Sequence, residues 1–107
     1  MNLDEIRRKV QLRRYRISWT HTEKLRHRQI SSDMIERAIE TGVLIESYPN
    51  DPRGPSCLLL GYSLEDRPLH VVCGKFDDDE LLIITAYEPS AAEWKSDWRT
   101  RKGGDEL

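Results

Sequence analysis

The sequence predicts an α+β fold, a single antiparallel meander sheet of four to five strands with helices packed on it. Four apolar stretches of six to eight residues follow one another in the second half of the chain, separated by short turns. Segments with helical periodicity precede them, and each begins with a residue that can cap a helix. The 107 residues suffice for one hydrophobic core, so we expect a single domain over residues 1–107.

The predicted sheet has short loops between consecutive strands. Its four main strands are expected at 43–48, 56–62, 69–76 and 81–87. Short connections favour antiparallel pairing, and the acidic turn at 77–80 discourages aggregation through a sheet edge. A further short strand is predicted at 15–19, where Tyr15, Ile17 and Trp19 alternate onto one face.

Three helices are expected before these strands. The first is a basic N-terminal helix at 2–12, which Asn2 can cap. A capping-box pattern opens the second, at 20–28, and Ser31 caps the third, which runs to residue 41. Gly42 then stands where a left-handed residue would end that helix.

A last helix is predicted after the sheet. Ser90 opens a second capping-box pattern, and Trp94 and Trp98, four residues apart, share one helical face. The simplest interpretation is that both rings dock this helix on the core, and base stacking is the alternative. Residues 103–107 are expected to form a loose tail.

The net charge of −2 conceals an uneven distribution of charge. Residues 1–30 contain nine Lys and Arg against three acidic residues, whereas residues 31–93 contain four against thirteen. Either the basic third binds an anionic partner, or the two parts attract each other in the folded chain. Both interpretations stay open at this point.

The sequence favours a cytoplasmic protein without a membrane partner. It contains no apolar run of transmembrane length and no signal-peptide pattern. Cys57 and Cys73 lie in apolar runs, which predicts two buried thiols in a reducing compartment.

No strong chemical motif is present, and the spacing of the three histidines predicts neither a metal site nor a cofactor site. His21 falls in the first turn of a predicted helix, whose dipole favours a neutral imidazole that can act as a base. Arg28, seven residues on, shares nearly the same face and could hold a phosphodiester's charge. The alternative is a histidine bonded at a helix start and an arginine in a surface ion pair.

Two strands carry the other candidate residues. His70 lies within an apolar strand, where it is either a hydrogen-bonded core histidine or a site residue. Thr85 and Tyr87 are expected on one face of the last strand together with Leu81 and Ile83. That face turns polar at the strand's end, so it either lines a cleft or marks where the core meets solvent.

Several segments, taken in order, resemble one known family. They are THTEKLRHRQISSDMIERAIETG at 20–42, ESYP at 46–49, SCLLLG at 56–61, RPLHVV at 67–72, IITAYEP at 83–89, and Trp94. This set is similar to the domain of unknown function 4258 family over about residues 15–99, and the basic helix at 2–12 lies outside it.

The resemblance implies a fold and a partner. The family is considered related to the RelE and BrnT group of small bacterial ribonuclease toxins, which implies a RelE-like sheet with helices packed on it. Its members often resemble the toxin half of a toxin–antitoxin pair. The implied partner is a small antitoxin with a zinc-binding segment and a helix-turn-helix, and no DNA binding is expected of this chain alone.

The resemblance also implies RNA cleavage without a metal. The signature residues carried over to this sequence are His21, Arg28, His70, Thr85 and Tyr87. RNA binding needs cationic surface, and the body of the chain is acidic, so Arg26, Arg99 and Arg101 are the expected RNA contacts. The alternative function is a non-catalytic module with a toxin fold that docks a protein partner.

Overall fold

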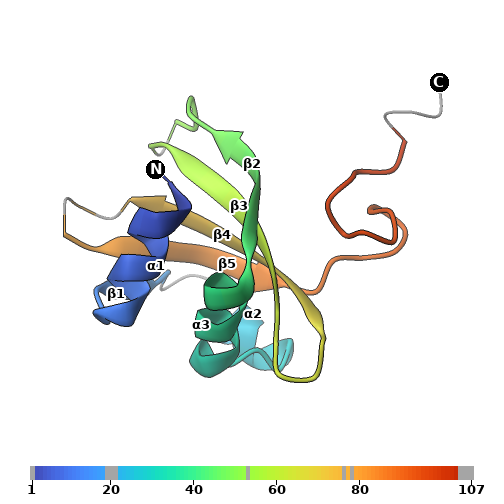
Figure 1. The fold of residues 1–107 in the computed structure, drawn as a ribbon, viewed down its shortest axis with the longest axis horizontal. Helices are drawn as coiled ribbons and strands as arrows, with labels where there is room; N and C mark the ends of the chain where they lie inside the picture. The colour runs from blue at the N-terminus through green and yellow to red at the C-terminus, as the bar shows by residue number, and fades with distance from the viewer. Residues whose placement is uncertain (1, 19–21, 53, 76, 78, 104–107) are drawn as a thin grey trace.

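Helices α1 and α3 cover one face of a five-stranded sheet (Figure 1). The C-terminal segment contacts the other face through Trp94, whose ring packs against His70. The computed structural model describes residues 2–18, 22–52, 54–75, 77 and 79–103. Its elements are α1 (Leu3–Gln11), β1 (Tyr15–Ile17), α2 (Thr22–His27), α3 (Ser32–Thr41), β2 (Val43–Tyr48), β3 (Ser56–Tyr62), β4 (Pro68–Lys75) and β5 (Leu81–Tyr87). No helix in these ranges is long and apolar enough to cross a membrane.

The sheet is mixed, with the strand order β1-β5-β4-β3-β2. Strands β2 to β5 form the predicted antiparallel meander. Strand β1 pairs with β5 in parallel, and Tyr15 lies opposite Leu81, so the prediction of a purely antiparallel sheet is wrong. Strand β1 has only 3 residues, and so short a sequence gives no signal of the direction in which the strand pairs. The direction is set by the turn after α1 and by backbone bonds such as Ser18 N–H to Ile83 O, 2.8 Å.

The predicted N-cap residues of α1 and α3 are confirmed. The Asn2 side chain accepts the Glu5 N–H at 2.8 Å, and the Ser31 hydroxyl accepts the Met34 N–H at 3.2 Å. The predicted cap of α2 at Thr20 lies outside the described residues. Helix α1 is firmly packed, since Ile6 is fully buried and belongs to the main core.

The main core lies between the helices and the sheet. Its buried members are Ile6, Val10, Leu25, Ile30, Ile35, Ala38, Ile39, Cys57, Leu59, Leu69, Val71, Cys73, Leu81, Ile83 and Ala86. Both cysteines are buried thiols, as predicted, and they lie opposite each other on β3 and β4. Burial raises the pKa of both thiols, which keeps them protonated and unreactive.

Gly42 ends α3 for a different reason from the predicted one. Its φ of −87° and ψ of 172° are extended, so it is not the left-handed residue we expected. A Cβ at Gly42 would lie 2.5 Å from the Ala38 oxygen and 2.7 Å from the Leu60 oxygen. A Cβ at Gly61 would lie 1.8 Å from the same Ala38 oxygen. Both glycines therefore permit the close approach of α3 to β3.

A second buried layer lies on the opposite face of the sheet. Strand alternation places Leu58, Leu60 and His70 there, and Trp94 of the C-terminal segment is 3% exposed. The Trp94 ring stands edge-on to the His70 ring, with centroids 4.5 Å apart. The predicted burial of Trp94 is confirmed, whereas Trp98 is only half-buried.

The prediction of a last helix after the sheet is wrong. Residues 89–103 form no α-helix, and their only backbone bond with the α-helical spacing of four residues runs from the Trp94 N–H to the Ser90 oxygen, 2.9 Å. The Asp97 carboxylate accepts the N–H groups of Arg99 and Thr100 at 2.9 and 3.0 Å. Such local side-chain acceptors compete with helix formation. The turn at Trp98, with φ of 59°, then reverses the chain.

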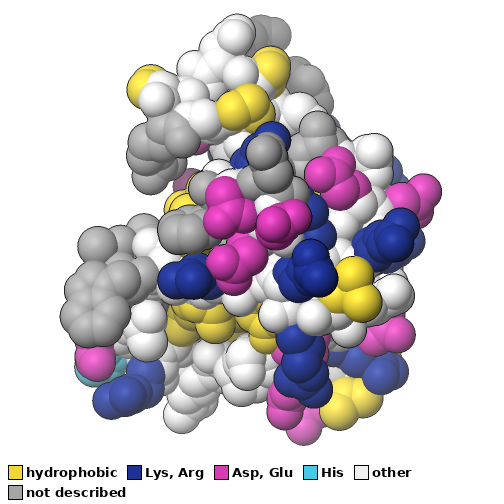
Figure 2. Space-filling view, turned by 90° about the vertical axis from the view of Figure 1, so that its left-hand side faces the viewer, with side chains coloured by type: hydrophobic (Ala, Val, Ile, Leu, Met, Phe, Trp, Pro, Cys, Tyr) yellow, Lys and Arg dark blue, Asp and Glu magenta, His cyan; other side chains and the backbone are white. Residues whose placement is uncertain are grey.

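Some basic side chains of residues 1–30 bind to groups of residues 31–93 within the folded chain. Arg7 of α1 donates to the carbonyl oxygens of Ile39 and Gly42 at the end of α3, at 3.2 and 2.6 Å, where the helix dipole favours a cation. Arg16 pairs with Glu80 at 3.2 Å. Figure 2 shows basic and acidic side chains interspersed on one face of the molecule. The interpretation that the two parts attract each other is thus supported for these contacts.

Candidate functional site

Arg28 is held at the end of α2 by a Schellman motif. The Ile30 N–H binds the Leu25 oxygen at 2.9 Å, and the Gln29 N–H binds the Arg26 oxygen at 3.0 Å. Gln29 takes the left-handed conformation with φ of 57°. Leu25 and Ile30 are both buried, so the turn is anchored in the main core. Arg28 therefore projects from a well-defined point of the backbone.

The Arg28 side chain reaches the edge of β5. Its Nη1 donates to the Thr85 hydroxyl at 3.2 Å and to the Ala86 oxygen at 2.8 Å. Strand β1 pairs only with residues 81–83, so this edge lies beyond β1. Among the described residues, Arg28 makes no ion pair with a carboxylate, and its two acceptors are neutral. Its positive charge is therefore not compensated by these neighbours.

A bulge in β5 moves Thr85 and Tyr87 to the face opposite the helices. The register passes from Val72 opposite Thr85 to Cys73 opposite Ile83, which leaves one extra residue on β5. Ile83 remains in the main core, so the prediction that it shares a face with Thr85 and Tyr87 is wrong. The bulge instead aligns Tyr87 with His70 across the sheet.

His70 and Tyr87 form a hydrogen-bonded pair on that face. The His70 Nε2 lies 2.8 Å from the Trp98 carbonyl oxygen, which can only accept, so Nε2 carries the proton. Nδ1 is then an acceptor that faces the Tyr87 hydroxyl at 3.4 Å. Burial is the main reason why the pKa of His70 is lowered and that of Tyr87 raised. The neutral imidazole therefore orients a protonated phenol.

His70 cannot touch a ligand, because it is fully buried. Trp94 covers its ring, and the Arg101 guanidinium stacks 4.5 Å from the Trp94 ring centroid. Arg101 in turn binds both carboxylate oxygens of Glu46 at 2.9 and 3.0 Å, which lowers the pKa of Glu46. The core interpretation of His70 is the better one, and any role it has in a site is to position Tyr87.

Mild acidification should destabilise the fold through His70. Its folded-state pKa lies below the ordinary value near 6.5, so below about pH 6.5 the unfolded chain binds a proton that the folded chain excludes. The free energy of unfolding should therefore fall as the pH falls. Urea denaturation at about pH 7.5 and about pH 5.5 measures this change. His70→Gln should show a smaller fall than the wild type, and an equal fall in both proteins contradicts the assignment.

Arg28 and Tyr87 line an open hollow of about 290 Å³ together with Ile30, Arg67 and Glu88. We call it the Arg28 hollow. Arg67 lies just before β4 and forms an ion pair with Glu88, which directly follows β5. A second contact runs from the Arg67 Nη2 to the Arg28 backbone oxygen at 3.5 Å. The hollow thus combines two guanidinium groups, one phenol and one carboxylate.

Four of the five predicted site residues fall in or directly behind this hollow. Arg28 and Tyr87 line it, Thr85 binds Arg28, and His70 binds Tyr87. His21 lies outside the described residues, so its part in the site stays a prediction.

The three predicted RNA contacts lie on two different parts of the chain. Arg26 on α2 pairs with Glu23 at 3.7 Å, and both side chains are exposed. Arg99 is exposed in the C-terminal segment, and Arg101 in the same segment is engaged with Glu46. None of the three lines the Arg28 hollow. Their RNA contacts remain untested predictions.

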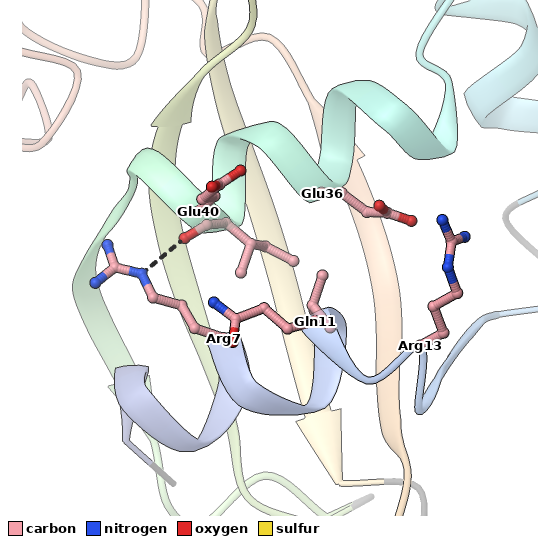
Figure 3. Close-up of a pocket in the computed structure, with 7 residues that line it drawn as sticks. Arg7, Gln11, Arg13, Glu36 and Glu40 are labelled. Atoms are coloured by element: carbon pink, nitrogen blue, oxygen red, sulfur yellow. Dashed lines mark hydrogen bonds between the residues drawn. The ribbon is translucent and has the colours of Figure 1, made fainter.

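Another cavity, of about 140 Å³, lies between α1 and α3 (Figure 3). Figure 3 shows Arg7 reaching the end of α3, while Glu36 and Arg13 stand at the other end of the cavity. The Tyr15 hydroxyl donates to Glu36, and burial with this bond raises the pKa of Tyr15 to about 12. These polar groups are engaged in joining α1 and β1 to α3, so we assign the cavity a structural role.

Sequence reasoning missed Arg67 and Glu88. Both stand in segments that carried the family resemblance, directly before Pro68 and directly after Tyr87. Their place in these segments was the signal that could have identified them as candidates. Their spacing along the chain does not indicate that the two side chains meet. Among the described residues no group of three His, Cys, Asp or Glu could hold a metal ion.

The comparisons with known proteins gave one match. A family model described as a domain of unknown function (DUF4258) matches residues 22–88. The match includes every residue that lines the Arg28 hollow, while α1, β1 and the C-terminal segment lie outside it. No curated protein and no solved structure matches the chain.

Proposed function

We propose that this chain, which belongs to the DUF4258 family of domains of unknown function, is a toxin-type, metal-independent endoribonuclease with its active site in the Arg28 hollow. The observation that carries the proposal is the guanidinium of Arg28, which has only neutral acceptors among the described residues, beside the phenol of Tyr87. A guanidinium fork suits the phosphate oxygens of RNA. The small antitoxin implied by the resemblance belongs to the same proposal.

In this mechanism the RNA 2′-oxygen attacks the adjacent phosphorus and the 5′-oxygen leaves. Arg28 stabilises the negative charge that develops on the phosphoryl oxygens. Tyr87 protonates the leaving oxygen, since its raised pKa keeps the phenol protonated at neutral pH. Thr85 and His70 are positioning residues, which hold Arg28 and Tyr87 respectively. His21 is the base predicted from the sequence.

Purified protein should cleave single-stranded RNA in the presence of EDTA and leave 2′,3′-cyclic phosphate and 5′-hydroxyl ends. Arg28→Ala should lower the cleavage rate by about 10²–10³-fold, because it removes the cation from the transition state. Tyr87→Phe should also slow cleavage, since it removes the proton donor and keeps the ring. Arg8→Ala, an exposed arginine of α1 outside the hollow, is the matched control and should cleave normally.

Each variant must first be shown to be folded, because Arg28 also binds the Ala86 oxygen. Expression of the wild type alone should slow bacterial growth, and Arg28→Ala should relieve the effect. RNA that stays intact over a broad range of sequences and pH contradicts catalysis. If the same protein binds a protein partner tightly, the docking module becomes the better description.

A further inference from the structure

The Arg28 hollow contains an ion pair that the mechanism above does not use. Arg67 and Glu88, which both line the hollow, are in direct ion-pair contact, and their side chains are 32% and 45% exposed. Glu88 is the only carboxylate among the described residues that line the hollow. The hollow therefore contains one group that can accept a proton, the Glu88 carboxylate, and Arg67 is paired with it.

This pair is suited to exchange partners. An ion pair this exposed contributes little stability, because water screens the two charges. A phosphodiester offers two anionic oxygens in a geometry that matches the guanidinium fork. A phosphate bound at the Arg28 guanidinium would occupy the hollow that Arg67 also lines. It would compete with Glu88 for the Arg67 side chain.

We propose that an RNA phosphodiester draws Arg67 away from Glu88, and that the released carboxylate accepts the proton of the 2′-hydroxyl. The proposal rests on the proposed function. It names Arg67 as the second phosphate contact and gives the role of base to Glu88 in place of His21. Substrate binding then controls whether the base can act, since the Glu88 carboxylate leaves its ion pair only when a phosphate binds Arg67.

The bonds balance without a co-reactant. The proton of the 2′-hydroxyl passes to a Glu88 oxygen as the 2′-oxygen bonds to phosphorus. The bond from phosphorus to the 5′-oxygen breaks, and that oxygen takes the Tyr87 proton. Glu88 then returns its proton to solvent and Tyr87 recovers one. Tyr87 and Glu88 both line the hollow, so both side chains can reach a phosphodiester bound there.

The test compares cleavage with binding. Glu88→Ala should lower the cleavage rate by about 10²–10⁴-fold, the range expected for loss of a general base. It should still bind an oligonucleotide that carries a 2′-deoxy nucleotide at the cleavage position. Added formate should restore part of the cleavage by Glu88→Ala, because a small carboxylate can replace the missing base. Arg67→Ala should weaken binding of the same oligonucleotide, and Glu65→Ala, an exposed acid outside the hollow, should behave as the wild type.

Three results would overturn the inference. Normal cleavage by Glu88→Ala excludes Glu88 as the base. Loss of both cleavage and binding in Glu88→Ala, with no recovery in formate, indicates a structural role. Loss of cleavage in His21→Ala that imidazole restores assigns the base to His21. A wild type that does not cleave RNA contradicts the proposed function itself, whereas a cleaving wild type with an unaffected Glu88→Ala contradicts only this inference.

Discussion

Trp94→Ala should lower the free energy of unfolding by about 3–5 kcal/mol, the range for truncating a buried tryptophan. The ring is 3% exposed and covers His70, with the two ring planes at 88°. The Arg101 guanidinium lies 4.5 Å from its centroid and adds a cation–π contact. Loss of the ring opens a cavity over a buried imidazole and removes the anchor of the C-terminal segment.

Urea denaturation followed by circular dichroism measures this change. Trp98→Ala is the matched control, because the Trp98 side chain is half-buried and only its backbone oxygen binds His70. We expect the control to lose clearly less stability than Trp94→Ala. An unchanged denaturation midpoint in Trp94→Ala would falsify the packing of residues 89–103 as part of the folded core.

Gly61→Ala should destabilise the protein by about 1–3 kcal/mol or more, as overpacking of a rigid contact does. The added Cβ would lie 1.8 Å from the Ala38 oxygen and 2.4 Å from the Ala38 carbonyl carbon. Both atoms belong to the backbone of α3 and cannot rotate away. The helix must therefore shift from β3, which loosens the contact of Ile35 and Ile39 with the sheet.

Gly74→Ala provides the comparison for Gly61→Ala. A Cβ at Gly74 would meet first the Ile84 Cδ1 at 3.1 Å, the end of a flexible side chain that can move. The two variants make the same chemical change in neighbouring strands, so the difference between their denaturation midpoints reports the backbone contact. Equal midpoints would show that α3 adjusts without cost.

The strands and the helix caps were predictable because their signals are local. The expected spans 43–48, 56–62 and 81–87 agree with β2, β3 and β5. Strand β4 begins at Pro68, one residue before the expected span 69–76, whose last residue lies outside the described residues. Ser31 and Asn2 cap helices as predicted, since each side chain bonds to an N–H three residues on. The predicted helix after Ser90 failed because Asp97 offers nearby N–H groups another acceptor.

The candidate site was predictable only in part. Helical and strand periodicity, with the family resemblance, gave Arg28, Thr85 and Tyr87. Strict alternation along β5 placed Thr85 and Tyr87 on the same face as Ile83, which is wrong. One extra residue in a bulge moves the side chains beyond it to the opposite face of the sheet. The burial of His70 agrees with the core interpretation, one of the two that the sequence offered, whereas its cover, Trp94, comes from a segment expected to be a helix.

Before residue 89, the sequence by itself determined which segments are helix and strand, where most of them begin, and that four strands follow one another antiparallel. These features depend on residues within a few positions of one another. The tertiary structure decided the parallel pairing of Tyr15 with Leu81, the approach of α3 to Gly61, and the meeting of Arg67 with Glu88. Each of these contacts joins residues that are 21 or more positions apart. The hydrogen bond from the Thr41 hydroxyl to the Tyr62 oxygen spans a similar distance along the chain, 21 positions. Their geometry follows from packing of the whole chain, which no short stretch of sequence encodes.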